Sequence, residues 1–206
     1  MQTINLIIPM AGFGKRFKSL SFNNYKTLLE VESNVSILDK LIYNFKDNKL
    51  NIILIINREV YLKYRNSFDK KDFNLIIIDK HDQGPLYTIL KAKEDIKKII
   101  KNSENIFVCY SDINWIWNFN NVKKFLKNKN VNVFTHFGYH PHLEVNSKSD
   151  FCKLKKNIVQ HMSQKKVISN DYKKDHLAIG CYYFKKFDYI ENYFKNNFLN
   201  KNNEYY

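Results

Sequence analysis

The sequence has no apolar run of the roughly 18 residues that a membrane span needs. Its first residues, 1–5, also lack the basic-then-apolar order of a secretion signal. Both absences predict a cytoplasmic protein without a membrane partner. The three cysteines lie far apart and form no C-x-x-C pair, which argues against a zinc knuckle or a disulfide framework. We expect buried free thiols at Cys109, Cys152 and Cys181.

Acidic residues are in the minority, with 20 Asp and Glu against 34 Lys and Arg and a net charge of +14. Clustered lysines would point to nucleic acid, because they neutralise its phosphates. These lysines are instead spread along the chain among many asparagines, which indicates a compositional bias. A nucleic-acid partner is therefore disfavoured, although a basic surface would help to gather polyanionic nucleotides.

With 206 residues, of which 44% are hydrophobic, the chain can bury one sizeable core and is too short for two ordinary ones. Continuous apolar runs, typical of parallel strands buried on both faces, lie at residues 4–9, 51–56, 74–78 and 105–110. Apolar residues at helical spacing predict helices over 36–50, 61–68 and 86–101. The alternation predicts a Rossmann-like three-layer α/β/α sandwich with a mostly parallel mixed sheet.

The regular alternation fades after residue 137. A helix at 121–128 and a strand at 131–136 are followed by strand-like segments at 151–154, 158–161 and 177–184, and by a helix at 187–198. We interpret residues 138–206 as a layer added to a first half, residues 1–137, within a single domain.

The strongest local signal follows the first predicted strand: Pro9-Met10-Ala11-Gly12-Phe13-Gly14-Lys15-Arg16-Phe17. Gly12 and Gly14 lack side chains where backbone N–H groups would approach a polyphosphate. Arg16 offers a planar fork for phosphate oxygens, and Lys26 offers a compact charge. The third glycine of a dinucleotide fingerprint and the G-K-[ST] of a Walker loop are both missing. The segment predicts a triphosphate site of another kind; the alternative is a glycine turn with solvated basic side chains.

Two further segments place polar groups after predicted strands. Asp82-Gln83-Gly84-Pro85 precedes a predicted helix, and Gly84 beside Gln83 would let the backbone hydrogen-bond a nucleotide base. An ordinary helix start is the alternative. Asp112 closes another strand and offers a hard oxygen ligand for Mg²⁺, with a helix cap as the alternative.

The segment from Ile8 to Phe17, with the later Lys26, resembles the N-terminal signature of the GT-A-like nucleotidyltransferase superfamily that makes sugar nucleotides. It is most similar to the branch found in capsular polysaccharide gene clusters, and the resemblance covers nearly the whole chain. Tyr25 and Thr27 stand where the family usually has prolines. The resemblance implies that Arg16 and Lys26 are catalytic residues that act on the phosphates. It implies nucleotide contacts from Ala11, Gly12, Phe13, Gly14, Lys15, Gln83 and Gly84.

The resemblance also implies a metal ion and an acceptor site. Asp112 takes the position of the family's first metal-binding aspartate, which implies Mg²⁺ as the cofactor. Gln164-Lys165-Lys166 resembles a Glu-Lys-Pro element, so Lys165 would grip the acceptor's phosphate, and Gly180 resembles a glycine that lies against the acceptor. Residues 1–137 would then be the nucleotide-binding half and 138–206 the acceptor-binding half. Because the family continues beyond this point, we expect a domain truncated at its C-terminus, and we name no second metal ligand.

The predicted function is that of a Mg²⁺-dependent nucleotidyltransferase. It would join a nucleoside triphosphate to a phosphorylated sugar or small polyol or alcohol phosphate, release pyrophosphate, and make a precursor of capsular or other surface polysaccharide. Leu86 and Tyr87 are bulky where many relatives have small residues, which favours a pyrimidine triphosphate, CTP before UTP. The sequence fixes neither the base, the acceptor nor the oligomeric state. The alternative is a nucleotide- or nucleic-acid-binding module without turnover, which Gln164 in place of the glutamate supports.

Overall fold

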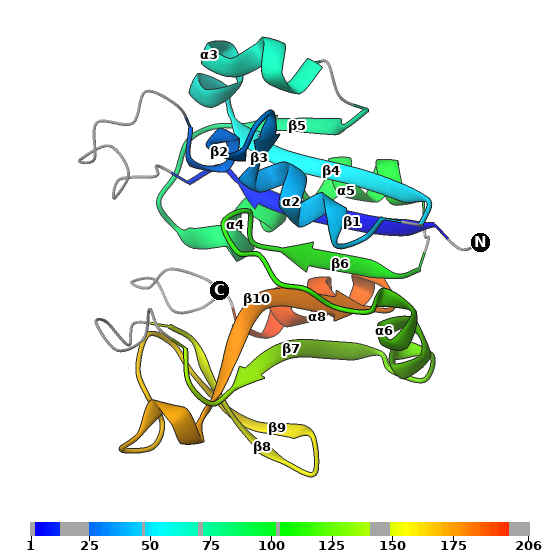
Figure 1. Ribbon diagram of the computed structural model, residues 1–206. Helices are drawn as coiled ribbons and strands as arrows, with labels where there is room; N and C mark the ends of the chain where they lie inside the picture. Colours follow the sequence, from blue (N-terminus) through cyan, green and yellow to red (C-terminus); the bar gives the residue numbers. More distant parts are fainter. Residues whose placement is uncertain are drawn as a thin grey trace. The chain divides into compact units, whose positions relative to one another are not determined.

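The computed structural model describes residues 3–12, 25–46, 48–69, 72–101, 104–140 and 149–197, with the side chains of 194–197 excepted. The chain forms two compact units (Figure 1). The larger unit comprises Met1–Asn132 and Tyr182–Tyr206, and the smaller comprises Val133–Cys181. The prediction of one nucleotidyltransferase domain with halves that meet at residues 137 and 138 stays a prediction.

Parallel strands form the sheet of the larger unit. They are β1 (Ile4–Met10), β4 (Leu50–Asn57), β5 (Asn74–Ile78) and β6 (Ile106–Cys109). The strand order is β5-β4-β1-β6, followed by β10 (His176–Phe184), and the pairs β4–β5, β1–β4 and β1–β6 are parallel. Each predicted apolar run became one of these strands, and the predicted α/β class with a mostly parallel mixed sheet is confirmed.

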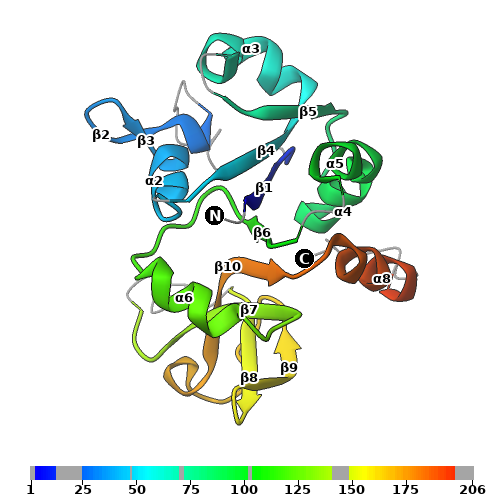
Figure 2. The same ribbon diagram turned by 90° about the vertical axis from the view of Figure 1, so that its right-hand side faces the viewer.

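Helices cover both faces of this sheet. Figure 2 shows α4 (Gly84–Lys91), α5 (Lys93–Ile100) and α8 (Phe187–Asn197) on one face and α2 (Ile37–Tyr43) on the other. Because side chains alternate along a strand, isoleucines from neighbouring strands face the first group of helices together. This core contains Ile7, Ile53, Ile55, Ile76, Ile89, Ile96, Val108 and Phe187.

Helix boundaries differ most from the prediction in two places. The predicted helix over 86–101 is two helices, α4 and α5, which meet at Ala92. The predicted helix over 36–50 ends at Tyr43, where backbone bonds from Asn44 to Leu41 and from Phe45 to Ile42 tighten the last turn. Its start is fixed by a capping box, because Ser36 and Asp39 each accept a hydrogen bond from the other's backbone N–H.

The opposite face of the sheet carries an aromatic cluster. Phe45, just after α2, contacts Phe107 of β6 with ring centroids 5.1 Å apart and Trp117 at 5.4 Å. Phe119, the first residue of α6 (Phe119–Leu126), lies 5.3 Å from Phe45. Edge-to-face packing of this kind adds about 0.5–1.5 kcal/mol per pair to the gain from burial. The cluster fixes the segment between β6 and α6 against the sheet.

Asparagines link three neighbouring strands of the larger unit. Asn51 of β4 donates from Nδ2 to Asn5 Oδ1 of β1 at 2.8 Å, and Asn74 of β5 donates to Asn51 Oδ1 at 2.8 Å. Asn5 is 1% exposed and donates its own Nδ2 to the carbonyl of Glu104 at 3.1 Å. The amides therefore satisfy one another among isoleucine side chains, which offer no hydrogen bonds.

The smaller unit is antiparallel. In it β8 (Phe151–Lys155) pairs with β9 (Ile158–Ser163) and with β10, and β7 (Val131–Phe137) also pairs with β10. Phe151 and Leu177 form its small core.

The remaining described elements of the larger unit are α3 (Arg58–Asp69), the short helix η1 (Lys26–Leu28) and the strands β2 (Glu30–Glu32) and β3 (Val35–Ser36). The smaller unit adds η2 (Tyr172–Lys174). The predicted free, buried thiols are confirmed for Cys109, Cys152 and Cys181. Among the described residues, no helix is both long and apolar enough to cross a membrane.

Candidate active site

The end of β1 is held by side chains from two other segments. Met10 and Ala11 are buried, at 2% and 1% exposure. The carbonyl of Ala11 accepts a hydrogen bond from Asn57 Nδ2 at 3.1 Å, and the carbonyl of Met10 accepts one from the Tyr25 hydroxyl. Asn57 also caps α3, since its Oδ1 accepts from the N–H of Val60 at 2.9 Å. Asn57 and Tyr25 thus hold the backbone at the start of the glycine signature.

Of the glycine signature, the structure describes Pro9 to Gly12. In the described part of the chain, a Cβ on Gly12 would meet no atom within 4 Å, so packing does not demand glycine there. Open space beside this backbone is what a polyphosphate would need. The other predicted residues of the segment lie outside the described residues: Phe13, Gly14, Lys15 and Arg16.

Lys26 and Asp112 meet although 86 residues separate them in sequence. Lys26 begins η1, and Asp112 follows the carboxyl end of β6. The ammonium donates to Asp112 Oδ2 as an ion pair, and the two side chains remain 27% and 37% exposed. Such a partly exposed pair contributes about 1 kcal/mol or less to stability, so stability alone is a poor reason for it. The structure thus brings together one predicted catalytic residue and the predicted metal ligand.

Tyr25, the residue before Lys26, donates its hydroxyl to the Met10 carbonyl at the end of β1. Burial and, to a smaller extent, the negative charge of Asp112 together raise the pKa of the Tyr25 phenol to about 12. The phenol therefore stays protonated and keeps donating to Met10. The sequence identified Tyr25 as a departure from the family's proline and did not reveal this bond, because its acceptor is a backbone carbonyl.

We expect Tyr25→Phe to lower the free energy of unfolding by about 1 kcal/mol, since it leaves the Met10 carbonyl without this donor. Urea denaturation near neutral pH measures the change. Tyr43→Phe is the matched control, because Tyr43 is 60% exposed. Above about pH 10 the unfolded chain ionises Tyr25 first, so the wild type should lose part of its stability there. Equal effects of the two substitutions would contradict a special role for Tyr25.

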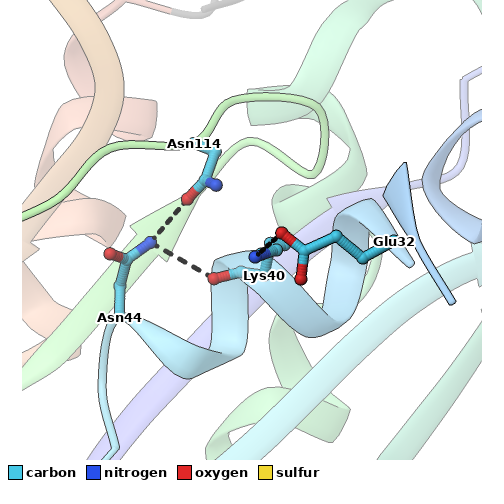
Figure 3. A network of polar contacts seen from close by, with 4 residues as sticks. All are labelled: Glu32, Lys40, Asn44 and Asn114. Carbon is cyan, nitrogen blue, oxygen red and sulfur yellow. Dashed lines mark hydrogen bonds and ion pairs between the residues drawn. The ribbon is translucent and has the colours of Figure 1, made fainter. Parts of the chain in front are cut away.

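The segment after Asp112 is fastened to the end of α2 (Figure 3). Asn44 Nδ2 donates to Asn114 Oδ1 at 2.9 Å and to the carbonyl of Lys40 at 3.3 Å. The indole N–H of Trp117 donates to the carbonyl of Asn44 at 2.8 Å. Asn44 thus binds both Asn114 and Trp117, shortly after Asp112 in the chain. These bonds limit where the Asp112 carboxylate can lie. No sequence signal marked Asn44, because asparagine is common throughout this chain.

The predicted base-binding loop leads into α4. Gly84 has φ +87, a conformation that favours glycine, and it is the first residue of the helix. Gln83 is the N-cap and is exposed, without a hydrogen bond from its own side chain to the helix. The structure places both residues at a helix start, which agrees with the predicted base-binding loop and equally with the alternative of an ordinary helix start. Nucleotide binding by them stays a prediction.

The predicted acceptor-binding residues, Lys165 and Gly180, lie in the smaller unit. Lys165 has φ +52 and its N–H donates to Asp150 Oδ1 at 3.2 Å. Burial raises the pKa of the Asp150 carboxyl, and the bond and charge of Lys165 act in the opposite direction. Gly180 has φ +68, which favours glycine within β10. Their roles in binding an acceptor stay predictions.

Within the described residues, no group of three or more His, Cys, Asp or Glu side chains could hold a metal ion. Asp112 alone carries the metal prediction. That donor set fits Mg²⁺, which is usually held by one or two carboxylates, water and the phosphates of the substrate.

No protein-family model matches the sequence, and no curated protein matches it. Solved structures do match. The nucleoside-diphosphate-sugar pyrophosphorylase from Vibrio cholerae RC9 is similar at a TM-score of 0.71 and 16% identity, over 95% of this chain and 79% of that one. A UDP-glucose pyrophosphorylase complexed with UDP-glucose has a TM-score of 0.65 and 16% identity, over 92% and 78%. The inositol-1-phosphate CTP transferase from T. maritima has a TM-score of 0.64 and 11% identity, over 90% of this chain and 71% of that one. This chain therefore has the α/β fold of these pyrophosphorylases and of this CTP transferase.

Proposed function

We propose that the protein is a nucleotidyltransferase that joins a nucleoside triphosphate to a phosphorylated sugar or a small polyol or alcohol phosphate. The meeting of Lys26 and Asp112 beside the end of β1 carries this proposal. Parallel sheets of this kind bind ligands outside the carboxyl ends of their strands, where both residues lie. The named activities of the similar structures support the same reaction class.

In the proposed reaction, an oxygen of the acceptor's phosphate attacks the α-phosphorus of the triphosphate. A new P–O bond forms, the bond between the α-phosphorus and the bridging oxygen to the β-phosphate breaks, and pyrophosphate leaves with that electron pair. Such a transfer needs positioning and charge neutralisation and no protein nucleophile.

The roles of the residues follow from their charges. Lys26 would leave Asp112 for the oxygens of the α-phosphate and stabilise the charge that develops there. Asp112 would hold Mg²⁺, which when bound neutralises the triphosphate and the leaving pyrophosphate. Arg16, Lys15, Phe13 and Gly14 keep their proposed contacts to the triphosphate. Ala11 and Gly12 would offer backbone N–H groups at a place where no atom of the described residues lies within 4 Å of a Cβ on Gly12.

For the substrates, we propose CTP before UTP on the bulk of Leu86 and Tyr87; the similar structures include a CTP transferase and a UDP-glucose pyrophosphorylase and support a pyrimidine in general. The product would serve as a precursor of capsular or other surface polysaccharide. A pyrophosphate-release assay tests the proposal, with each triphosphate against a panel of sugar, polyol and amino-alcohol phosphates, with and without Mg²⁺. If no pair releases pyrophosphate while RNA binds tightly and loses affinity steeply with salt, the alternative of a binding module replaces the enzyme.

Lys165→Ala is expected to raise KM for the acceptor about tenfold and to leave KM for the triphosphate near its original value. Lys165 would hold a phosphate that is present before and during the reaction, so its loss weakens binding more than turnover. Steady-state kinetics with each substrate varied in turn measures both constants. Lys153→Ala on β8, in the same unit, is a matched control. A raised KM for the triphosphate with an unchanged KM for the acceptor would contradict the division into nucleotide-binding and acceptor-binding halves.

A further inference from the structure

We propose that His81 is a positioning residue that holds the nucleotide-binding loop, residues 82–84, in the shape that receives the base. This inference rests on the proposed function, because Gln83 and Gly84 are its proposed base contacts. The carrying observation is a chain of hydrogen bonds that runs from the loop backbone through the His81 ring to Thr88 of α4 and back to the loop.

This chain of hydrogen bonds begins and ends on the backbone of the loop. The N–H of Gln83 donates to His81 Nδ1 at 3.2 Å. On the other side of the ring, His81 Nε2 lies 3.0 Å from Thr88 Oγ1, and Thr88 Oγ1 donates to the carbonyl of Gly84 at 3.2 Å. The imidazole therefore fixes one backbone group of the loop directly and a second through the hydroxyl.

These bonds are consistent with a single tautomer of the ring. Because Nδ1 accepts from Gln83, the proton of the neutral ring sits on Nε2 and is donated to Thr88. Thr88 is 2% exposed, so its hydroxyl is shielded from competing water. Each donor in the chain meets an acceptor, and bonds linked in this way strengthen one another.

The helix start explains why an outside residue is needed. Side chains usually cap a helix from its N-cap, yet Gln83 makes no such bond. Gly84, at φ +87, has no Cβ that could limit its backbone, so contacts from outside must hold the turn. Tyr87, one turn into α4, places its ring 4.8 Å from the imidazole at 70° and limits rotation of His81.

Protonation would break the chain at its first bond, since a proton on Nδ1 would face the N–H of Gln83. The charged groups around the ring act in opposite directions: Asp82, in the loop, favours the imidazolium, and Lys91, on α4, disfavours it. Desolvation is the largest effect and lowers the pKa of His81 below its usual 6.5. The ring is thus neutral at neutral pH, and the loop loses its support only in acid.

The test compares His81→Asn with His81→Ala. An asparagine places its Oδ1 near the position of Nδ1, accepts from the N–H of Gln83, and does not titrate. His81→Asn is expected to keep KM for the triphosphate within about threefold of the wild type, whereas His81→Ala should raise it about tenfold, the equivalent of one lost hydrogen bond. KM for the acceptor should stay the same in both. His161→Asn on β9, where the ring is exposed, is the matched control.

The pH profile separates positioning from a merely structural role. As the pH falls below about 6.5, down to the lowest pH at which circular dichroism shows a folded protein, the ratio of KM for the triphosphate in the wild type to that in His81→Asn should rise as His81 protonates. The ratio cancels the titration of the nucleotide itself, which affects both proteins equally. A ratio that stays flat over the whole range in which the protein is folded, or His81→Ala with unchanged KM in an active protein, would overturn the role of His81 and leave the proposed function intact. If calorimetry shows no triphosphate binding by the wild type, the proposed function falls and this role falls with it.

Discussion

Asp112→Asn is expected to lower Mg²⁺-dependent pyrophosphate release by about 10³-fold or more. The amide oxygen can still accept a hydrogen bond from Lys26, so the substitution keeps the local geometry and removes the charge that a hard cation requires. Because the Asp112 side chain is 37% exposed at a strand end, the fold should be unaffected. Initial rates over a series of Mg²⁺ concentrations measure the effect, and circular dichroism checks the fold.

Asp95→Asn is the matched control for Asp112. Asp95 lies on α5, is 58% exposed and pairs with Lys98 at 2.9 Å, so its loss removes a carboxylate and an ion pair from a helix that carries none of the proposed site residues. It should leave the rate within about twofold of the wild type, as is usual for exposed pairs. Retained activity in Asp112→Asn would remove the metal assignment, whatever the control does.

Lys26→Ala is expected to lower kcat about 10²-fold or more with little change in KM for the acceptor. The reason is that the ammonium would act mainly on charge that develops at the α-phosphate during transfer. The loss of the Lys26–Asp112 pair itself should change stability by about 1 kcal/mol or less, because both side chains are partly exposed. Single-turnover rates separate the chemical step from substrate binding.

Lys40→Ala controls for the loss of one ion-paired lysine from the same unit, since Lys40 pairs with Glu32 and is 31% exposed. It should leave kcat near the wild-type value. If Lys26→Ala raised KM for the triphosphate and kept kcat, Lys26 would be a ground-state binding residue, and the charge that develops in transfer would need another partner.

The parallel strands β1, β4, β5 and β6 were predictable, because short, continuous apolar runs are typical of strands buried on both faces. Lys26 and Asp112 could be assigned to one site because each lies where the chain leaves a predicted strand or follows the glycine signature. The break at Ala92 could not be read from the sequence, because the apolar spacing of α4 and α5 runs on across it.

The supporting contacts were also out of reach of the sequence. Asn44 and Asn114 are 70 residues apart, and Tyr25 bonds to a backbone carbonyl that has no sequence signature. Contacts of this kind depend on the distance between segments after folding, which composition and periodicity do not carry. His81 shows the same limit, since its partners are the N–H of Gln83 and the hydroxyl of Thr88.

The asparagines that link β1, β4 and β5 bear on how these strands choose their pairing. A slip of two residues between isoleucine-rich strands would return each side chain to the same face, so burial alone scarcely distinguishes the slipped sheet from the native one. In the native register Asn5 stands opposite Asn51, and their amides bond at 2.8 Å. After such a slip the Oδ1 of Asn5, which is 1% exposed, would lose the Asn51 donor, at a cost of about 1–3 kcal/mol. The asparagines thus help to specify the register of strands whose other side chains are mostly isoleucine and leucine.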